Sequence, residues 1–225
     1  MKLKGMTARV LYLLWKDLLL DYRNPYSLGT QAIFSLSAGV VSGLAARSSP
    51  WPPESLAPAT LALVSLFNSV YASYSTFIRE REQGTLEALQ LIPGGPLALY
   101  ASKLLYSAFI IASFNIVYIL AYVLFSGASH VASLGVFEWA LTASLFMAAV
   151  SSFSSAMLVY SSSYTTLAPL IVTALSLPYL DVALDSLAVL TQGYNPPSHW
   201  RVEMAAPAIA ASLLGGVLAS YVLES

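Results

Sequence analysis

Ionisable side chains are scarce in this sequence, and their positions restrict the chemistry that the chain can perform. Four of them follow one another directly, Arg79 to Glu82, within the stretch FIREREQGTLEALQLIPGGP at residues 77–96. Alternating basic and acidic side chains suit ion pairing within a helix or across an interface. The sequence contains no cysteine, which excludes disulfides, thiolate metal sites and cysteine nucleophiles.

Long segments carry no ionisable group. No Asp, Glu, Lys, Arg or His occurs in 55–78, 104–129, 139–180 or 204–223. Carriers driven by protons or sodium usually place such groups at the depth of the membrane centre, and an intramembrane hydrolase needs a base or a metal-ligand cluster there. The sequence argues against both classes. It also lacks the phosphate-binding pattern G-x-x-x-x-G-K-[ST], so any ATP must be bound by another polypeptide.

The composition places this chain in a membrane. Hydrophobic residues make up 57% of the 225 residues and charged residues only 9%, against roughly 25% charged in an ordinary soluble domain. A helix needs about 20 mostly apolar residues to cross the hydrocarbon core of a bilayer. We therefore predict an all-α integral membrane protein, a single transmembrane domain over 1–225. Its six transmembrane helices are expected at 27–46, 56–78, 97–125, 136–160, 165–180 and 205–223.

The connecting segments predict the orientation. With the N-terminus in the cytoplasm, eight lysines and arginines lie on the cytoplasmic side, and two, Arg47 and Arg201, lie outside. This asymmetry is the positive-inside bias. We expect a multi-pass protein of the cell membrane with both termini in the cytoplasm. The outer loop 181–204 is long, and its segment 181–190 has the spacing of a surface helix or of a re-entrant helix beside the fifth span.

Residues 6–23, before the first span, predict a helix that lies in the membrane interface. At 100° per residue one face is apolar and includes Trp15, while Arg9, Lys16 and Arg23 fall seven residues apart on the other face. We expect Trp15 at the level of the lipid headgroups and the cations toward anionic lipid. A membrane crossing is excluded here, because Lys16 and Asp17 would each cost about 2.5–3.5 kcal/mol at the centre of a span.

The charged stretch at 79–82 predicts a helix end at the boundary of the second span. Arg79 to Gln83 continue the second helix into water, with Arg79 and Glu82 paired at i,i+3. Gly84 supplies the left-handed residue that ends the helix. Thr85 is then a natural N-cap for a further short helix.

That short helix is expected at 85–92. Glu87 complements the positive end of its dipole, and Leu86, Leu89 and Ile92 share one face up to Pro93. Two interpretations are open. The segment is a positive-inside charge cluster with an interfacial turn, or it is a rigid knob that docks on a cytoplasmic partner and passes the motion of that partner to the spans.

Uncharged polar residues lie within the predicted spans. Gln31, Asn68 and Asn115 are candidates for lining a translocation route, and helix packing is the alternative. Small residues recur at four-residue spacing and predict close helix contact, within one chain or across a dimer: Ser35, Gly39, Gly43, Ala211, Gly215 and Ala219.

His130 and His199 fall in the predicted outer loops. An outer histidine can ligate haem iron, but a lone loop histidine is more often solvated. We predict no catalytic residue, no metal site and no cofactor bound by this chain, and no nucleic-acid partner.

The pattern ERE-x-GTLE-x-L-x-x-x-P, formed by residues Glu80 to Pro93, resembles the signature at the end of the second span of ABC-2 type ABC-transporter permeases. Within that superfamily the chain is most similar to the cytochrome c maturation permease, the CcmB-like haem exporter subunit. The similarity extends to LLWKDLLLDYRNP before the first span and to LAPLIVTALSLPYL, with paired prolines, in the fifth. The turn SSSY between the fourth and fifth spans departs from the family, in which basic residues are expected there.

The resemblance implies the partners. Two copies of the permease would assemble with two copies of a CcmA-like ABC ATPase that binds ATP, beside a CcmC-like haem-handling membrane protein, with haem as a candidate substrate. The helix at 6–23 would be the gate-side elbow. The residues coupled to the ATPase would be Arg79, Glu80, Arg81, Glu82, Gly84, Thr85, Leu86, Glu87, Leu89 and Pro93.

Two other functions stay open at this point. The chain is an ABC-2 permease for another substrate, such as a drug, an ion or a polysaccharide, or a membrane scaffold that recruits a soluble protein through the same knob without transport.

Overall fold

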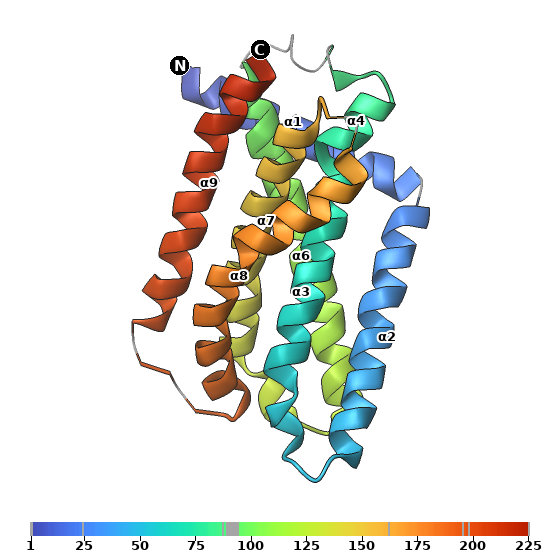
Figure 1. Cartoon of the computed structure of the whole chain (residues 1–225), viewed down its shortest axis with the longest axis vertical. Helices are drawn as coiled ribbons and strands as arrows, with labels where there is room; N and C mark the ends of the chain where they lie inside the picture. Colours follow the sequence, from blue (N-terminus) through green and yellow to red (C-terminus); the bar gives the residue numbers. More distant parts are fainter. Residues whose placement is uncertain are drawn as a thin grey trace.

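The computed structural model describes residues 2–23, 25–86, 88, 95–161, 163–194, 196–197 and 199–224. Over these residues the chain forms helices joined by turns (Figure 1). The long helices are α1 (Lys2–Arg23), α2 (Tyr26–Ser48), α3 (Ala57–Ser73), α6 (Gly95–Ser126), α7 (Leu134–Leu158), α8 (Tyr164–Thr191) and α9 (Trp200–Glu224). The short ones are α4 (Arg79–Glu82), a π-helix at Tyr74–Ile78, and 3-10 helices at Pro53–Ser55 and Ser129–Ala132.

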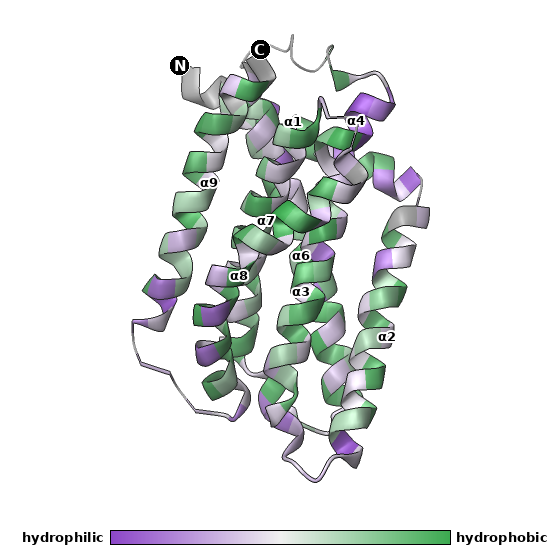
Figure 2. Ribbon diagram, viewed as in Figure 1, coloured by the Kyte–Doolittle hydropathy of each residue, from purple (hydrophilic) through white to green (hydrophobic). Residues whose placement is uncertain are grey.

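The predicted fold class is confirmed. Within the described residues, six helical segments are long and apolar enough to cross a membrane: Leu28–Ser48, Pro53–Glu82, Pro96–Ser126, Leu134–Leu158, Thr166–Thr191 and Trp200–Ala219. Figure 2 shows hydrophobic residues along these spans and hydrophilic residues mainly toward the two ends of the bundle. α1 lies across one end, beside α4, and the last turn of α9 lies at that same end (Figure 1). We call it the charged end and the opposite end the far end.

The fourth span is the centre of the bundle. α7 packs against α3, α6, α8 and α9. Trp139 on α7 is fully buried, and its indole Nε1 donates to the carbonyl oxygen of Ala183 on α8 at 2.9 Å. A buried indole N–H needs such an acceptor, so this bond fixes α8 against α7 near the far end.

Small residues bring α2 close to α6, as their four-residue spacing predicted. A Cβ atom added to Gly39 would lie 2.7 Å from Cβ of Ala121 and 2.8 Å from the carbonyl oxygen of Tyr118. A Cβ atom added to Gly43 would lie 2.9 Å from the carbonyl oxygen of Tyr122. The two helices therefore approach each other closely at these glycines, and this contact is made within one chain.

The expected end of the fifth span at residue 180 was wrong. α8 runs without interruption to Thr191, so 181–190 continue the fifth span and do not form a separate surface or re-entrant helix. Asp181 and Asp185, both exposed, are the charges that interrupt the apolar run in the sequence. Ala183, Leu187 and Leu190 are nevertheless buried against the bundle, so the helix keeps its packing face past the aspartates.

Candidate functional site

Charged residues from three helices gather at the charged end of the bundle. They comprise three acids and three bases, and we call them the buried charge cluster: Lys16, Asp17 and Asp21 of α1, Arg79 and Glu80 of α4, and Lys103 of α6. The three acids and Lys103 are only 2–3% exposed. Buried charges persist only when they are paired, so each of these side chains depends on the others.

Lys103 joins α6 to both other helices of the cluster. Its Nζ lies 2.7 Å from Oε1 of Glu80 and 2.9 Å from Oδ2 of Asp17. Lys16 bridges the same two acids, with Nζ at 2.8 Å from Oε1 of Glu80 and 3.3 Å from Oδ1 of Asp17. Thr85 donates its hydroxyl to the other oxygen of Glu80 at 2.5 Å. Glu80 is therefore held by α1, by α6 and by the residues that follow α4.

Asp21 forms the second centre of the cluster. Nη1 of Arg79 lies 2.6 Å from its Oδ1, and the Tyr106 hydroxyl donates to its Oδ2. Asp17 and Asp21 are one turn apart on α1, and Lys103 and Tyr106 are three residues apart on α6. Side chains at these spacings share one helix face. The helical repeat of α1 and α6 therefore aligns two acids with two partners.

The charge of Lys16 is stabilised by its surroundings. Burial alone would lower the pKa of this lysine, but the hydrogen bonds and the negative charges of Glu80 and Asp17 outweigh burial and raise the pKa above its ordinary value of 10.5. Lys16 is therefore protonated at neutral pH. Its positive charge belongs to the contact between α1 and α4.

This arrangement corrects the prediction that Lys16 faces lipid headgroups. Asp17 and Asp21 of α1 face α6. Lys16 lies beside them because its Nζ contacts two carboxylates, those of Asp17 and Glu80. Arg9 and Arg23 are exposed, and Trp15 is 64% exposed. The helix thus buries a charged ridge and exposes an apolar side that includes Trp15. That side is the one expected to meet the membrane interface.

An irregular turn separates α4 from α3. In the π-helix Tyr74–Ile78, Thr76 has non-helical backbone angles of φ −90° and ψ −107°. The backbone N–H of Phe77 donates to Oγ of Ser155 on α7 at 3.1 Å. A single π-turn inside a longer helix is commonly found at functional sites. α4 is therefore joined to α3 through a bend, and Ser155 of the fourth span accepts a hydrogen bond from a backbone N–H at this bend.

The outer face of α4 contacts the turn between α7 and α8. Nη1 of Arg81 donates to the carbonyl oxygen of Ser161 at 2.7 Å, and its guanidinium lies 6.0 Å from the ring centre of Tyr164. The Tyr164 hydroxyl donates to Glu82. The turn SSSY contains no basic residue, and Arg81 of α4 places a basic side chain against it. The expected i,i+3 pair of Arg79 and Glu82 was wrong, because each has a partner on another helix.

The chain beyond α4 is described only in part. Gly84 has φ +67°, which confirms the left-handed helix end predicted there. Thr85 directs its described hydrogen bonds back to Glu80, and Leu86 is 5% exposed in a core cluster with Phe77 and Leu99. Leu86 therefore anchors this segment and is not open to a partner. The predicted short helix 85–92 otherwise lies largely outside the described residues, as do Glu87, Leu89 and Pro93.

Comparison with known families identifies the chain. Residues 33–178, more than half of the sequence, match the model of the ABC-2 family transporter proteins. The chain belongs to this family. Comparison with curated proteins gives no match.

Family membership makes this chain a membrane subunit of an ABC transporter, and it implies an ABC ATPase as partner. The matched range contains α4 and Lys103, whereas the α1 half of the buried charge cluster precedes it. In this ABC-2 protein the N-terminal helix therefore supplies acids to a centre whose other residues lie within the family-typical part.

Sequence reasoning missed Asp17, Asp21, Lys103 and Tyr106 as site residues. Two signals could have identified this centre. Asp17 and Asp21 are acids at i,i+4 spacing in a segment rich in cations, and Lys103 is a charge inside a span, where a partner is required.

The three predicted lining residues of this ABC-2 protein lie together inside the bundle. Nε2 of Gln31 donates to Oδ1 of Asn68 at 3.2 Å, and Nδ2 of Asn68 donates to Oδ1 of Asn115 at 3.4 Å. All three are at most 3% exposed. They link α2, α3 and α6 in this conformation.

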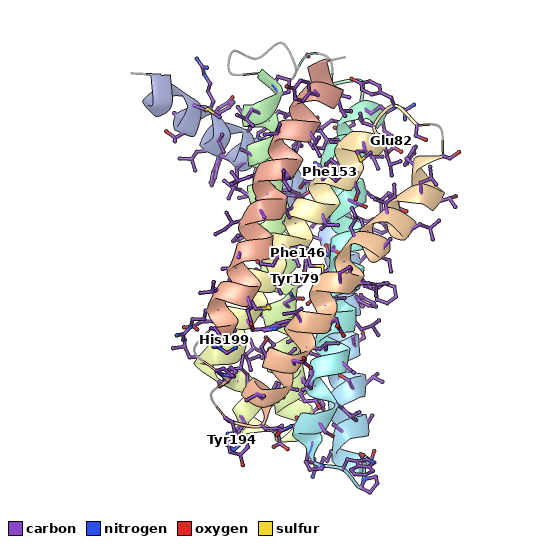
Figure 3. All side chains as sticks on the ribbon, turned by 60° about the vertical axis from the view of Figure 1, so that its left-hand side comes forward. Glu82, Phe146, Phe153, Tyr179, Tyr194 and His199 are labelled. Carbon is purple, nitrogen blue, oxygen red and sulfur yellow. The ribbon has the colours of Figure 1, made fainter. Side chains whose placement is uncertain are left out.

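The two histidines are at the far end, away from the buried charge cluster. His199 is exposed and lies 3.6 Å from Glu203, and Figure 3 shows it at the end of the bundle opposite Glu82. His130 lies in the 3-10 helix Ser129–Ala132. Among the described residues no three His, Asp or Glu side chains are grouped so as to hold a metal ion. Arg201 and Glu138 form an exposed ion pair at the far end, where Nη2 of Arg201 lies 2.8 Å from Oε2 of Glu138.

Proposed function

We propose that this chain is the permease subunit of an ATP-driven ABC-2 exporter, and that α4 passes the movement of a separate ATPase to the spans. The single observation that carries the proposal is the position of α4. Its inner side chains, Arg79 and Glu80, are ion-paired with α1 and α6, and its outer side chains, Arg81 and Glu82, bind the α7–α8 turn. A displacement of α4 therefore pulls on both halves of the bundle.

The bend at Thr76 suits this role. A rigid continuous helix would transmit a push on α4 only along α3. The π-helix Tyr74–Ile78 lets α4 rotate about its junction, while the ion pairs direct the motion into α1 and α6. The segment after Leu86 is our proposed contact for the ATPase, with Glu87 and Leu89 on it.

The charged end is our proposed cytoplasmic end. Eight of the ten lysines and arginines belong to it in the predicted topology, and Arg47 and Arg201 belong to the far end. An ATPase driven by cellular ATP must bind on that side, so orientation and coupling support each other.

A fluorescent label at the far end tests whether α4 passes the movement of the ATPase to the spans. The chain has no cysteine, so Tyr194→Cys, at an exposed position of the far end, accepts a single environment-sensitive fluorophore. In nanodiscs with the ATPase, ATP should change the emission of this label. Arg81→Ala and Glu82→Ala should abolish the change, because these side chains connect α4 to α7 and α8. ATP hydrolysis should continue, because both side chains are exposed and their loss leaves the core intact.

Glu203→Ala is the matched control, since it removes an exposed carboxylate at the far end and should leave the signal intact. An ATP-dependent signal that survives both α4 variants would overturn the proposal. A signal that is equally large with a catalytically dead ATPase would favour the scaffold without transport.

We also propose that the exporter serves cytochrome c maturation, with haem as substrate, a CcmA-like ATPase, a second copy of the permease and a CcmC-like protein as partners. This finer assignment is supported by LLWKDLLLDYRNP before the first span and by Pro169 and Pro178 in the fifth. Covalent haem attachment to c-type cytochromes should fail in cells that lack the gene. Normal attachment there would assign the permease to another substrate.

A further inference from the structure

A pocket opens at the far end of the bundle, where three connecting segments lie (Figure 1). It has a volume of about 450 Å³, and its wall carries polar as well as apolar atoms. This volume is within the range of roughly 300–1,000 Å³ that is usual for pockets that bind small molecules. The wall comes from the turn between α2 and α3, from the 3-10 helix after α6 and from the turn after α8: Pro52, Glu54, Ser55, His130, Gln192 and Tyr194.

The segment that carries Glu54 is fixed by its own turn and by α6. It forms a 3-10 helix in which the backbone N–H of Ser55 donates to the carbonyl oxygen of Pro52 at 2.9 Å. The Tyr122 hydroxyl on α6 donates to the carbonyl oxygen of Pro53 at 2.5 Å. The two consecutive prolines have restricted φ angles. The side chain of Glu54 therefore starts from a rigid backbone.

The wall formed by the end of α8 is also ordered. Gly193 has φ +82° and donates its N–H to the carbonyl oxygen of Leu190 at 3.1 Å, while the N–H of Tyr194 donates to that of Val189 at 3.2 Å. This pair of bonds is the Schellman helix end, which favours glycine at the left-handed position. A Cβ atom added to Gly193 would lie 2.8 Å from Nδ1 of His130, so the imidazole packs on this turn. The pocket is therefore formed before any ligand binds.

Glu54 gives this pocket a negative charge that no neighbouring side chain neutralises. Within the described residues its carboxylate forms no ion pair, and none of the residues that line the pocket is lysine or arginine. Asp181 and Asp185 on α8 are unpaired as well, but they are exposed to water, whereas Glu54 is partly buried. A carboxylate that has lost part of its hydration attracts a cation more strongly than an exposed one does.

The charges around the pocket have the same sign. In the predicted topology the far end has only two of the ten lysines and arginines, Arg47 and Arg201. A negative surface raises the local concentration of cations and disfavours anions. The far end has five acids in all: Glu54, Glu138, Asp181, Asp185 and Glu203.

We propose that this pocket binds a small organic cation, an ammonium, amidinium or guanidinium group on an apolar or aromatic body. The cationic group donates to the carboxylate of Glu54, and the body contacts the ring of Tyr194, whose π face attracts cations. Hydrogen bonds to an ionised partner are roughly twice as strong as neutral ones, so the charge of the ligand determines its selection. A metal ion suits the pocket less well, because among the described residues no three His, Asp or Glu side chains are grouped.

The inference goes beyond the proposed function and does not depend on it. It concerns the far end, whereas the proposed coupling takes place at α4. Binding is measured without nucleotide or ATPase, so a negative result would overturn the cation site and leave the proposed role of α4 untouched.

Two probes of the same shape test the site. Benzamidinium carries a positive charge and two neighbouring N–H donors, and benzamide is its neutral counterpart. Both are titrated into the full-length permease in nanodiscs of a zwitterionic lipid at low salt, with empty nanodiscs subtracted. Benzamidinium should bind at least about tenfold more tightly, the fold-change that one charge-assisted hydrogen bond produces.

In Glu54→Gln the affinity for benzamidinium should fall to that for benzamide. The melting temperature of this variant should stay close to that of the native protein, because Glu54 forms no ion pair within the described residues. Asp185→Asn is the matched control, since it removes the same charge from the far end at an exposed position outside the pocket. It should retain the preference for benzamidinium.

Three results would overturn the inference. The first is that benzamidinium fails to bind the native protein or binds no more tightly than benzamide. The second is an unchanged preference in Glu54→Gln. The third is a loss of preference in Asp185→Asn as large as in Glu54→Gln, which would show that the general negative charge of the far end, and not the pocket, attracts the cation.

Discussion

Lys103 and Glu80 form an ion pair of 2.7 Å between residues 23 positions apart, at the place where the second span ends and the third begins. The lysine is 2% exposed and the glutamate 3% exposed. A buried ion pair thus links two hydrophobic spans at the charged end of the bundle. α1 completes this contact through Lys16 and Asp17, so the N-terminal helix is part of the centre and does not merely rest on the membrane.

Lys103→Met should destabilise the protein strongly. It leaves Glu80 and Asp17 buried with Lys16 as the nearest cation, and loss of one partner from a buried pair costs about 3–5 kcal/mol. The melting temperature in nanodiscs, followed by intrinsic tryptophan fluorescence, should fall by on the order of 10 °C. The double variant Lys103→Met with Glu80→Gln should recover much of this loss, because it removes one charge of each sign.

Arg201→Met serves as the control for this pair. Arg201 and Glu138 are also ion-paired, but their side chains are 67% and 37% exposed. Exposed pairs contribute about 0–1 kcal/mol. A melting temperature that falls as much in Arg201→Met as in Lys103→Met would show that burial of the cluster is not what matters.

The docking of α1 should depend on pH in the alkaline range. The pKa of Lys16 is raised above 10.5 by Glu80 and Asp17, so its contribution to stability is fully present below pH 10.5 and is lost as the pH rises through the higher folded-state pKa. Spin labels at Tyr12→Cys on α1 and Phe109→Cys on α6 report the separation of the helices by pulsed electron resonance. Their distance distribution should stay constant from about pH 6 to 9 and broaden above about 10.5.

Lys16→Arg should move this transition further upward, since a guanidinium keeps its proton at higher pH. A distribution that broadens already near pH 7, or one that broadens at the same pH in Lys16→Arg, would contradict the assignment to Lys16.

The sequence was sufficient for the architecture because hydropathy is a local property. An apolar run of the required length predicts a span without knowledge of its neighbours, and the same holds for the left-handed Gly84 and for the small-residue spacing at Gly39 and Gly43. The fifth span was cut short because Asp181 and Asp185 interrupt the hydropathy. The continuation of the helix is visible only in its buried side chains, and these are buried because α8 packs against α7.

The site was beyond such reasoning because its contacts are non-local. Lys16 and Glu80 are 64 positions apart, and the periodicity of α1 alone places Lys16 on a polar face without saying what that face meets. The π-helix Tyr74–Ile78 contains neither proline nor glycine, so no residue type in the sequence indicates the bend. The acceptor that stabilises it, Ser155, comes from another span.

Ser155→Ala should loosen the bend between α3 and α4. It removes the acceptor of the buried Phe77 N–H and leaves that donor unsatisfied, at a cost of about 1–3 kcal/mol. Amide hydrogen exchange should increase in the segment 74–82 and remain unchanged in α9. Ser151→Ala is the control, because the Ser151 hydroxyl donates only to the carbonyl oxygen of Ala148 in its own helix. Equal exchange in the two variants would mean that Ser155 does not hold the bend.

Gly39→Ala should separate α2 from α6. The added Cβ atom would lie 2.7 Å from Cβ of Ala121 and 2.8 Å from the carbonyl oxygen of Tyr118, and neither a backbone atom nor a Cβ atom can rotate away. The helices must move apart, at a cost of about 1–3 kcal/mol. Gly29→Ala is the matched control on the same helix, because its added Cβ meets nothing within 4 Å.

In an ordinary helix position, replacing glycine by alanine stabilises by roughly 0.5–1 kcal/mol. Melting temperatures of the two variants in the same nanodiscs should therefore shift in opposite directions, downward for Gly39→Ala and slightly upward for Gly29→Ala. Since the two changes are chemically identical, the difference between them measures the α2–α6 contact alone. A Gly39→Ala protein as stable as the native one would show that the two backbones do not meet as closely as the structure places them.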